Sequence, residues 1–277
     1  MHVPMPSRAP SPTLTLLSLL VTTARGLVVL PDGRQCRILT DEHAVATHIL
    51  SRVAALANEA IADKGAFSIS IGSGTTVAPL SQLAGALDFD RVHVFFGNER
   101  TEGESAGKCF DGAADFVSVC GIPESNVHRV PAGEASSSAA LYEATLRGAP
   151  DNVVGVCSRT GLPALDLVLL GSGADGHTAS LYPDSAQVVD AAADQACVAA
   201  EGKGGVTLTL HAINSARNVL LSAAKPAQSD MVRKALGWSN AATNVKLPAA
   251  MVQAAADGST RVEWVLTEAS AVELPAL

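Results

Sequence analysis

The sequence is poor in aromatic residues. They make up only 4% of the 277 residues, whereas 48% of the residues are hydrophobic, and these are mostly Ala, Val and Leu. This balance is typical of layered helices and strands around a buried core and not of an aromatic-rich binding surface. The length suits one large domain or two small ones. We therefore expect a globular α/β protein.

Positive charge is also scarce. The formal net charge is -8 and the isoelectric point is near 5.3. A nucleic acid or an anionic membrane surface is bound by a clustered basic face, and this overall negative charge argues against such a face. We therefore expect no nucleic-acid partner and no membrane partner, and any phosphate group has to be held by a local site.

Several motifs of metal and covalent chemistry are missing. The cysteines are widely spaced and form no CxxC pair, so they indicate neither a disulfide framework nor a thiolate metal site, and we expect free thiols in the core. They are Cys36, Cys109, Cys120, Cys157 and Cys197. No HExxH or GxxxxGK[ST] motif is present, and GESAG at 103–107 fits GxSxG formally but does not directly follow a predicted strand, so no nucleophile elbow is indicated. These observations argue against a metal hydrolase and a serine hydrolase.

Acidic residues are absent from the first 31 residues, which include Arg8, Arg25 and several hydroxyl side chains. The apolar stretch within this segment is much shorter than the roughly 20 residues that span a bilayer. It is compatible with a signal h-region or an organelle transit peptide. We predict that residues 1–30 form a targeting leader or a disordered extension and that residues 31–277 form the domain. The location is then the cytoplasm or an organelle such as a plastid.

Hydrophobic periodicity predicts helices that alternate with short strands. Helical spacing over 41–63, with Thr40 or Asp41 as N-cap, precedes a strand over 67–71, a glycine loop and helical spacing again over 80–87. Further strands are predicted over 92–96, 165–170, 206–210, 219–221 and 262–266, and further helices over 137–146 and 229–236. Such alternation implies crossovers, so we predict one doubly wound, mostly parallel sheet with helices on both faces, similar to a Rossmann fold.

Ligands of such sheets bind beyond the carboxyl ends of the strands, which directs attention to four loops. The first contains Gly72, Ser73, Gly74 and Thr75. Its glycines let backbone amides converge, and a helix N-terminus behind them would add partial positive charge. This loop suits a phosphate group, although an ordinary strand-to-helix turn has the same composition.

The second loop, GSGADG at 171–176, formally fits the GxGxxG fingerprint of dinucleotide sites, and Asp194 lies near the spacing of a ribose-binding acid. Two residues argue against a dinucleotide. Asp175 would place a carboxylate in a loop meant for pyrophosphate, and Pro183 would interrupt the helix that should follow.

Asp175 and His177 can instead be reactive side chains of this loop. An imidazole can accept a proton from water, and a neighbouring carboxylate can fix its tautomer. Gly176 between them allows a tight turn. From spacing alone, a structural histidine beside a helix-capping acid is the simpler interpretation.

Arg100 and Lys225 follow the strands over 92–96 and 219–221 and should lie at the same sheet edge. Arginine offers phosphate oxygens a planar fork, and lysine offers a compact point charge. Taken singly, either residue is equally compatible with a solvated surface charge.

Taken in order, these segments resemble the 6-phosphogluconolactonase family, within the larger group that includes glucosamine-6-phosphate deaminases. The most specific match is LDLVLLGSGADGHTASLYP at 165–183, which is similar to the family's strand and GxGxDGHxASLFP loop. Further matches support this resemblance. They are the glycine loop, VHVFF with Glu99-Arg100, IPESNVHRVP, VTLTLHAIN, Lys225, LPAAMV and EWVL. The resemblance covers the chain from about residue 36 to the C-terminus and implies a fold of the glucosamine-6-phosphate deaminase type.

The resemblance implies hydrolysis of 6-phospho-D-glucono-1,5-lactone to 6-phosphogluconate in the oxidative branch of the pentose phosphate pathway, which supplies NADPH, with no metal and no organic cofactor. His177 would be the general base for a water molecule, Asp175 would orient its imidazole, and amides of the 171–176 loop would bind the oxyanion. The positions implied to bind the substrate and its phosphate are Gly72, Ser73, Gly74, Thr75, Arg100, Gly173 and Lys225. The oligomeric state and a functional coupling to glucose-6-phosphate dehydrogenase stay open.

The sequence departs from the family pattern at three places. Asn98 stands where the family commonly has Asp, Ser105-Ala106 replaces a Ser-Asn pair, and Gly205 replaces an Arg. If that Arg binds phosphate, one cation is missing, and either Lys203 substitutes for it or the remaining cations suffice. We therefore expect a raised Michaelis constant and intact chemistry.

Two other functions are compatible with the same fold. A sugar-phosphate isomerase or deaminase needs further acid–base groups, and it typically has carboxylates at the positions that Asn98 and Tyr182 occupy here. Because hydrolysis needs only one base and an anchored electrophile, these two residues favour hydrolysis. A catalytically inactive phosphosugar-binding protein is the third possibility, motivated by Gly205 and Asn98.

Overall fold

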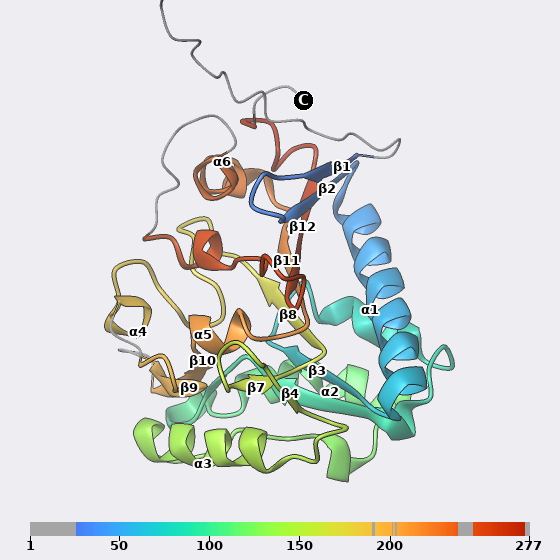
Figure 1. Cartoon of the computed structure of the whole chain (residues 1–277), viewed down its shortest axis with the longest axis vertical. Helices are drawn as coiled ribbons and strands as arrows, with labels where there is room; N and C mark the ends of the chain where they lie inside the picture. The colour runs from blue at the N-terminus through green and yellow to red at the C-terminus, as the bar shows by residue number, and fades with distance from the viewer. Residues whose placement is uncertain (1–25, 190–191, 201, 203, 238–245, 275–277) are drawn as a thin grey trace, which may run out of the picture.

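The structure is a computed structural model of the chain, and it describes residues 26–189, 192–200, 202, 204–237 and 246–274 (Figure 1). The α-helices are α1 (Glu42–Lys64), α2 (Lys108–Cys120), α3 (Ala135–Gly148), α4 (Ala186–Val189), α5 (Leu210–Ile213) and α6 (Ser229–Leu236). The 3₁₀ helices are η1 (Ala78–Leu83), η2 (Phe89–Arg91), η3 (Gly103–Ser105), η4 (Glu124–Asn126), η5 (Pro226–Gln228) and η6 (Pro248–Met251).

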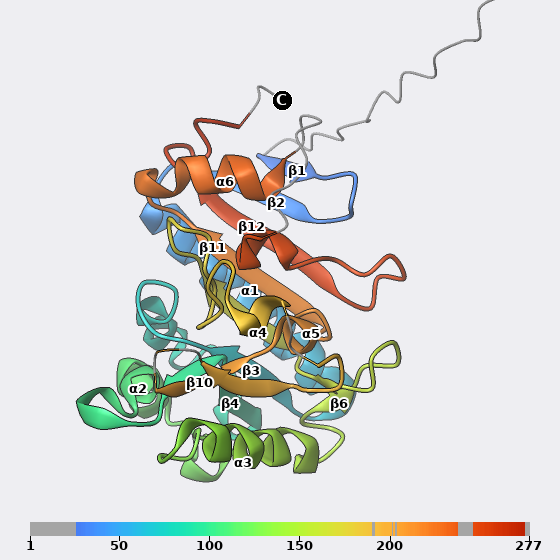
Figure 2. The same cartoon turned by 90° about the vertical axis from the view of Figure 1, so that its left-hand side faces the viewer.

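A seven-stranded sheet forms the centre of the molecule, in the order β1-β2-β12-β11-β8-β3-β4. Its strands are β1 (Leu27–Val29), β2 (Gln35–Leu39), β3 (Phe67–Ile71), β4 (Val92–Phe96), β8 (Leu167–Gly171), β11 (Asn218–Ala223) and β12 (Arg261–Thr267). All neighbours in it are parallel except β1 and β2. In Figures 1 and 2, α1 lies along one face of the sheet, and α6 and the segment with α4 and α5 lie on the other. The prediction of one mostly parallel sheet covered on both faces is confirmed.

The ends of α1 agree with the sequence pattern. Asp41 accepts the N–H of Ala44 at 2.8 Å as N-cap, and Gly65 ends the helix with φ 84°, a conformation that glycine adopts without strain. The face that α1 buries against the sheet repeats at helical spacing through Val45, Ile49, Val53 and Leu56. The predicted helix over 41–63 is therefore confirmed, as is the helix over 229–236.

Two expectations were wrong in detail. The spacing over 80–87 is not an α-helix, since η1 ends at Leu83 and the chain then turns at Gly85, whose φ is 74°. The segment over 206–210 is not a strand of the main sheet. It forms β10 (Gly205–Leu208), which pairs antiparallel with β5 (Asn98–Arg100) and β9 (Cys197–Ala200) in a separate three-stranded sheet. A two-stranded ribbon joins β6 (Gly155–Val156) and β7 (Pro163–Ala164).

The amino-terminal part of the described chain belongs to the sheet. Leu27 to Val29 pair with residues 35–37, so the sheet begins before the boundary at residue 31 that composition suggested. Most of the predicted leader, residues 1–25, lies outside the described residues. No helix among the residues that the structure describes is long and apolar enough to cross a membrane. All five cysteines are buried and free, as expected.

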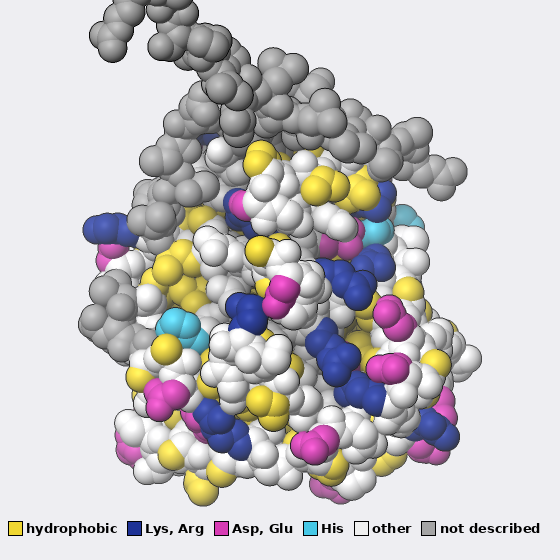
Figure 3. Space-filling view, in the orientation of Figure 1, with side chains coloured by type: hydrophobic (Ala, Val, Ile, Leu, Met, Phe, Trp, Pro, Cys, Tyr) yellow, Lys and Arg dark blue, Asp and Glu magenta, His cyan; other side chains and the backbone are white. Residues whose placement is uncertain are grey.

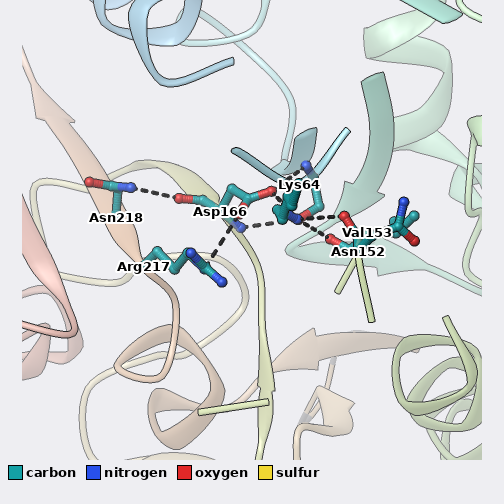
Figure 4. Close-up of polar contacts among 7 residues, drawn as sticks. Lys64, Asn152, Val153, Asp166, Arg217 and Asn218 are labelled. Atoms are coloured by element: carbon teal, nitrogen blue, oxygen red, sulfur yellow. Dashed lines mark hydrogen bonds and ion pairs between the residues drawn. The ribbon is translucent and has the colours of Figure 1, made fainter. Parts of the chain in front are cut away.

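Asp166 connects α1 to the start of β8 (Figure 4). Its Oδ2 accepts the N–H of Ser68 at 2.8 Å and lies 2.8 Å from Nζ of Lys64. The same ammonium group donates to the carbonyl oxygens of Asn152 at 2.8 Å and Val153 at 3.0 Å. Asp166 is only 3% exposed, so its charge is balanced by neighbouring protein groups and not by water.

We expect Asp166→Ala to lower the free energy of unfolding by about 3–5 kcal/mol, because it leaves Lys64 as an uncompensated, largely buried charge. Urea titration of the full chain measures this value. Asp88→Ala is the matched control, since Asp88 and Arg91 form an exposed pair that should contribute about 1 kcal/mol or less. Equal unfolding midpoints for the two variants would contradict the assigned role of Asp166.

Candidate active site

A cavity of about 420 Å³ lies at the carboxyl ends of β3, β4, β8 and β11, four strands that are adjacent in the sheet. The loop that follows each strand contributes to its lining. The sequence-predicted residues that line it are Gly72, Ser73, Gly74, Thr75, Arg100, His177 and Lys225. The parallel topology thus brings together residues that are more than 150 positions apart in the sequence.

The loop after β3 presents backbone donors to this cavity. Among the described residues, the N–H groups of Ser73, Gly74 and Thr75 have no intramolecular acceptor, and these residues are exposed. Converging free amides form an anion-binding concavity. The helix dipole that we expected behind this loop is absent, because only the short η1 follows. The loop is therefore suited to phosphate by its free backbone amides and not by a helix dipole.

His177 and Asp175 form a pair at the rim of the cavity. Nδ1 of His177 lies 2.6 Å from Oδ1 of Asp175, and the same oxygen accepts the backbone N–H of His177 at 3.2 Å. Partial burial raises the pKa of Asp175, but these hydrogen bonds and the nearby imidazole outweigh it and hold the pKa below its usual value. Asp175 is therefore ionised at neutral pH and accepts a hydrogen from Nδ1.

The neighbours of His177 fix its position. The ring of Tyr182 stacks on the imidazole with a centroid distance of 4.8 Å and an interplanar angle of 28°. A Cβ atom at Gly173 would lie 2.2 Å from Nδ1 of His177, so only glycine fits beneath the ring. Gly176 has φ 87°, which lets the chain turn between Asp175 and His177.

The 171–176 loop agrees with one expectation and differs from another. The described segment from Gly173 to Ser185 contains no helix, so the GxGxxG match lacks the helix that a dinucleotide site requires. The N–H groups of Ser172 and Gly173 donate to the carbonyl oxygens of Ser222 and His177. These two amides are engaged within the protein, and they are not free to bind an oxyanion.

The sequence reasoning missed Lys108 and Gln228, which also line the cavity. Lys108 is the first residue of α2, a helix that the spacing of Cys109, Ala113 and Phe116 could have revealed. The side chain of Gln228 accepts the N–H of Lys225 at 2.7 Å and donates to the carbonyl oxygen of Ser172. Gln228 thereby connects the Lys225 loop to the loop that contains Asp175 and His177.

Glu99 holds the start of α2 at the cavity. Its carboxylate accepts the backbone N–H groups of Cys109 and Phe110, each at 2.8 Å, and it is only 3% exposed. A carboxylate at this point satisfies two unpaired amides of the helix and complements its dipole. Glu99 therefore positions Lys108, whereas Arg100, the next residue, lines the cavity directly.

The structure shows the surroundings of two of the three departures from the family pattern, Gly205 and Asn98. A Cβ atom at Gly205 would lie 2.2 Å from the carbonyl oxygen of Glu99, so no side chain fits there with this backbone. Lys203, the suggested substitute, lies outside the described residues. Asn98 lines the cavity and donates from Nδ2 to Oγ of Ser180 at 3.1 Å. Lys108 adds a cation that the family pattern did not lead us to expect.

The formally charged residues that line the cavity are all positive among those described. Lys108, Lys225 and Arg100 line it, whereas none of its described lining residues is Asp or Glu. No group of three or more His, Cys, Asp or Glu side chains among the described residues is arranged to hold a metal ion. The arrangement can bind a dianionic group and present one imidazole to a neutral electrophile beside it.

Comparison with known proteins identifies the family. A family model described as glucosamine-6-phosphate isomerases/6-phosphogluconolactonase matches residues 40–264. The chain belongs to this family. A Mycobacterium tuberculosis protein named 6-phosphogluconolactonase is 30% identical over 227 residues, which cover 78% of this chain and 88% of that protein.

Two further comparisons extend over more of the chain. An Arabidopsis thaliana protein named probable 6-phosphogluconolactonase 4 is 28% identical over 279 residues, which cover 94% of this chain and 99% of that protein. The crystal structure of 6-phosphogluconolactonase from Leishmania guyanensis superposes with a TM-score of 0.69 at 21% identity and covers 87% of this chain. The structural likeness shows that the fold is the one that the sequence resemblance implied.

Proposed function

We propose that this protein is a 6-phosphogluconolactonase, which hydrolyses 6-phospho-D-glucono-1,5-lactone to 6-phosphogluconate. The observation that carries the proposal is that His177, paired with Asp175, lines the same cavity as the free amides of the 73–75 loop and three cationic side chains, groups that can bind a phosphate. Family membership and the names of the relatives support it.

The hydrogen bond between His177 and Asp175 determines which ring nitrogen reacts. An ionised carboxylate only accepts, so the hydrogen of the neutral imidazole lies on Nδ1 and the lone pair lies on Nε2. Nε2 takes a proton from water as the water oxygen attacks the lactone carbonyl carbon. The tetrahedral intermediate then collapses, the ring C–O bond breaks, and the imidazolium returns its proton to the leaving ring oxygen. Asp175 stabilises the imidazolium between these steps.

The substrate phosphate is assigned to the other end of the cavity. The free amides of the loop at 73–75 donate to its oxygens, and Lys225, Lys108 and Arg100 balance its charge. Anchoring a group remote from the reacting carbon fixes the lactone near His177, which lowers the entropic cost of the attack.

Hydrolysis suits the cavity better than isomerisation or deamination. Both of those reactions move protons between carbon atoms and need acid–base groups besides the histidine. The positions where carboxylates were expected for them hold Asn98 and Tyr182, and Tyr182 is occupied in stacking on His177. A binding protein without activity is also less favoured, because binding alone does not need a histidine that is oriented by an ionised carboxylate.

An assay of the full chain tests the proposal. Fresh 6-phosphogluconolactone should be hydrolysed well above its spontaneous rate, and glucosamine 6-phosphate should release no ammonia and form no isomer. Turnover of glucosamine 6-phosphate without lactone hydrolysis would establish the alternative enzyme. Tight binding of 6-phosphogluconate without hydrolysis would instead establish a binding protein.

Removal of either cavity lysine should weaken substrate binding more than catalysis. We expect Lys225→Ala and Lys108→Ala each to raise KM about tenfold, since each loses a charge-assisted contact to phosphate, with a much smaller change in kcat. Steady-state kinetics measure both constants. Lys234→Ala, on the exposed face of α6, is the charge-matched control. A wild-type KM for Lys108→Ala would remove Lys108 from the phosphate site.

A plastid location is a separate part of the proposal. A rice protein named as chloroplastic is 29% identical over 227 residues, and the absence of acidic residues from residues 1–31 suits a transit peptide. A reporter fused to residues 1–30 should enter plastids, and a reporter that stays in the cytosol would rule this location out.

A further inference from the structure

A second cavity, of about 280 Å³, lies at the opposite end of the sheet strands. Gln35, Asn218 and Arg261 line it, and they are the first residues of β2, β11 and β12. The active-site loops, in contrast, all follow carboxyl ends of strands. The two cavities share no lining residue, and the proposed hydrolysis makes no use of the second one.

The strand register gathers polar side chains on one face of the sheet at this cavity. Asn218 pairs with Arg261, and Gln35 pairs with Glu263, across neighbouring parallel strands. Paired residues share a face, and so do alternate residues along one strand, which adds Arg37 to the group. A sheet face next to a long helix is ordinarily apolar, so this concentration of polar groups needs an explanation.

The charge of the cavity is positive. Arg37, Arg52 and Arg261 line it together with a single acidic residue, Glu263, which leaves a surplus of two positive charges. Burial raises the pKa of Glu263, but its hydrogen bond to His48 and the nearby guanidinium groups outweigh burial and lower the pKa, so Glu263 is ionised. The surplus is unusual in a chain whose net charge is -8.

Glu263 forms hydrogen bonds with His48 and Arg52 but not with Arg261. Nε2 of His48 lies 2.7 Å from one carboxylate oxygen of Glu263, and Nε of Arg52 donates to the other at 3.0 Å. Arg261 is exposed, and among the described residues its side chain has no hydrogen-bond or ion-pair partner. On the side of the molecule next to α1, Figure 3 shows Lys and Arg side chains gathered together.

The side-chain oxygen of Asn218 is a hydrogen-bond acceptor that has no donor among the described residues. Its Nδ2 donates to the carbonyl oxygen of Asp166 at 2.9 Å, which fixes the orientation of the amide. In Figure 4 its Oδ1 lies at the end turned away from Asp166, and this buried oxygen has no hydrogen-bond partner among the described residues. A hydroxyl group that reached the floor of the cavity would satisfy it.

We propose that this cavity binds a small phosphorylated compound that carries hydroxyl groups. A phosphate monoester carries roughly -1.5 to -2 charges at pH 7, which matches the surplus of two positive charges. Guanidinium forks suit phosphate oxygens, with Arg261 as the principal contact, and Asn218 accepts a hydroxyl. The site is independent of the proposed hydrolysis.

Calorimetric titration with glycerol 3-phosphate tests the site. Titration into the Lys225→Ala variant, whose active site has lost a cation, should still detect binding at millimolar concentrations, and acetate should bind far more weakly. Adding Arg261→Gln should weaken the binding about tenfold or more. Adding Arg91→Gln, the same change at an exposed arginine elsewhere, should leave it unchanged. Arg261→Gln alone should retain wild-type lactonase activity.

Two results would overturn the second site. One is the absence of glycerol 3-phosphate binding to the Lys225→Ala variant, and the other is equal binding by the Arg261→Gln and Arg91→Gln versions of it. Neither result bears on the hydrolysis, which is tested by the lactone assay alone.

Discussion

Replacing His177 with alanine should lower kcat for 6-phosphogluconolactone by about a hundredfold to ten-thousandfold, the contribution typical of a general base. KM should change little, because we assign the substrate phosphate to groups elsewhere in the cavity. The physical reason is the lone pair on Nε2, which Asp175 maintains by accepting the hydrogen of Nδ1 at 2.6 Å. Initial rates, corrected for spontaneous hydrolysis, measure the effect.

His43→Ala is the control for this prediction. His43 is exposed on α1 and does not line the cavity, so its loss should leave kcat unchanged. Circular dichroism and thermal unfolding of both variants show whether the fold is retained. A folded His177→Ala protein with wild-type kcat would eliminate His177 as the base.

Asp175→Asn should lower kcat by about a hundredfold, although the side chain keeps its size. An amide can donate as well as accept, so it can bind Nδ1 without a hydrogen and move the hydrogen of the imidazole to Nε2. It also removes the negative charge that stabilises the imidazolium. Nitrogen NMR of labelled His177 should show the hydrogen on Nδ1 in the wild type and on Nε2 in a substantial fraction of the variant.

Asp184→Asn is the matched control for this substitution. Asp184 is exposed, pairs with Lys246 and has φ 60°, a conformation that asparagine also adopts. We expect it to keep wild-type kcat. If Asp175→Asn kept it too, Asp175 would have no role in orienting or stabilising the base.

The parts of the fold that the sequence predicted are those set by local chemistry. The helix α1 is defined by its buried stripe and by caps at Asp41 and Gly65, so its ends followed from residues close in the chain. β10 depends on a partner that lies about a hundred residues away, since Val206 pairs with Glu99. Its strand character was predictable, but its membership in a separate sheet was not.

The same distinction holds for the site. Parallel topology was enough to place the loops of Gly72, His177 and Lys225 at one edge of the sheet. Lys108 could not be placed in that way, because the carboxylate of Glu99 draws the start of α2 to the cavity through two backbone hydrogen bonds. The engaged amide of Gly173 was hidden for a different reason, since its bond to the carbonyl oxygen of His177 depends on how this irregular loop folds back on itself.

The most direct test of the account compares two lactones with the wild-type protein. Fresh 6-phosphoglucono-1,5-lactone and glucono-1,5-lactone have the same reacting carbonyl, and only the first has the phosphate that Lys225, Lys108 and the glycine loop are assigned to bind. The account predicts a kcat/KM at least about a hundredfold higher for the phosphorylated lactone, equivalent to two charge-assisted contacts. No acceleration of either hydrolysis, or equal kcat/KM for both lactones, would contradict it.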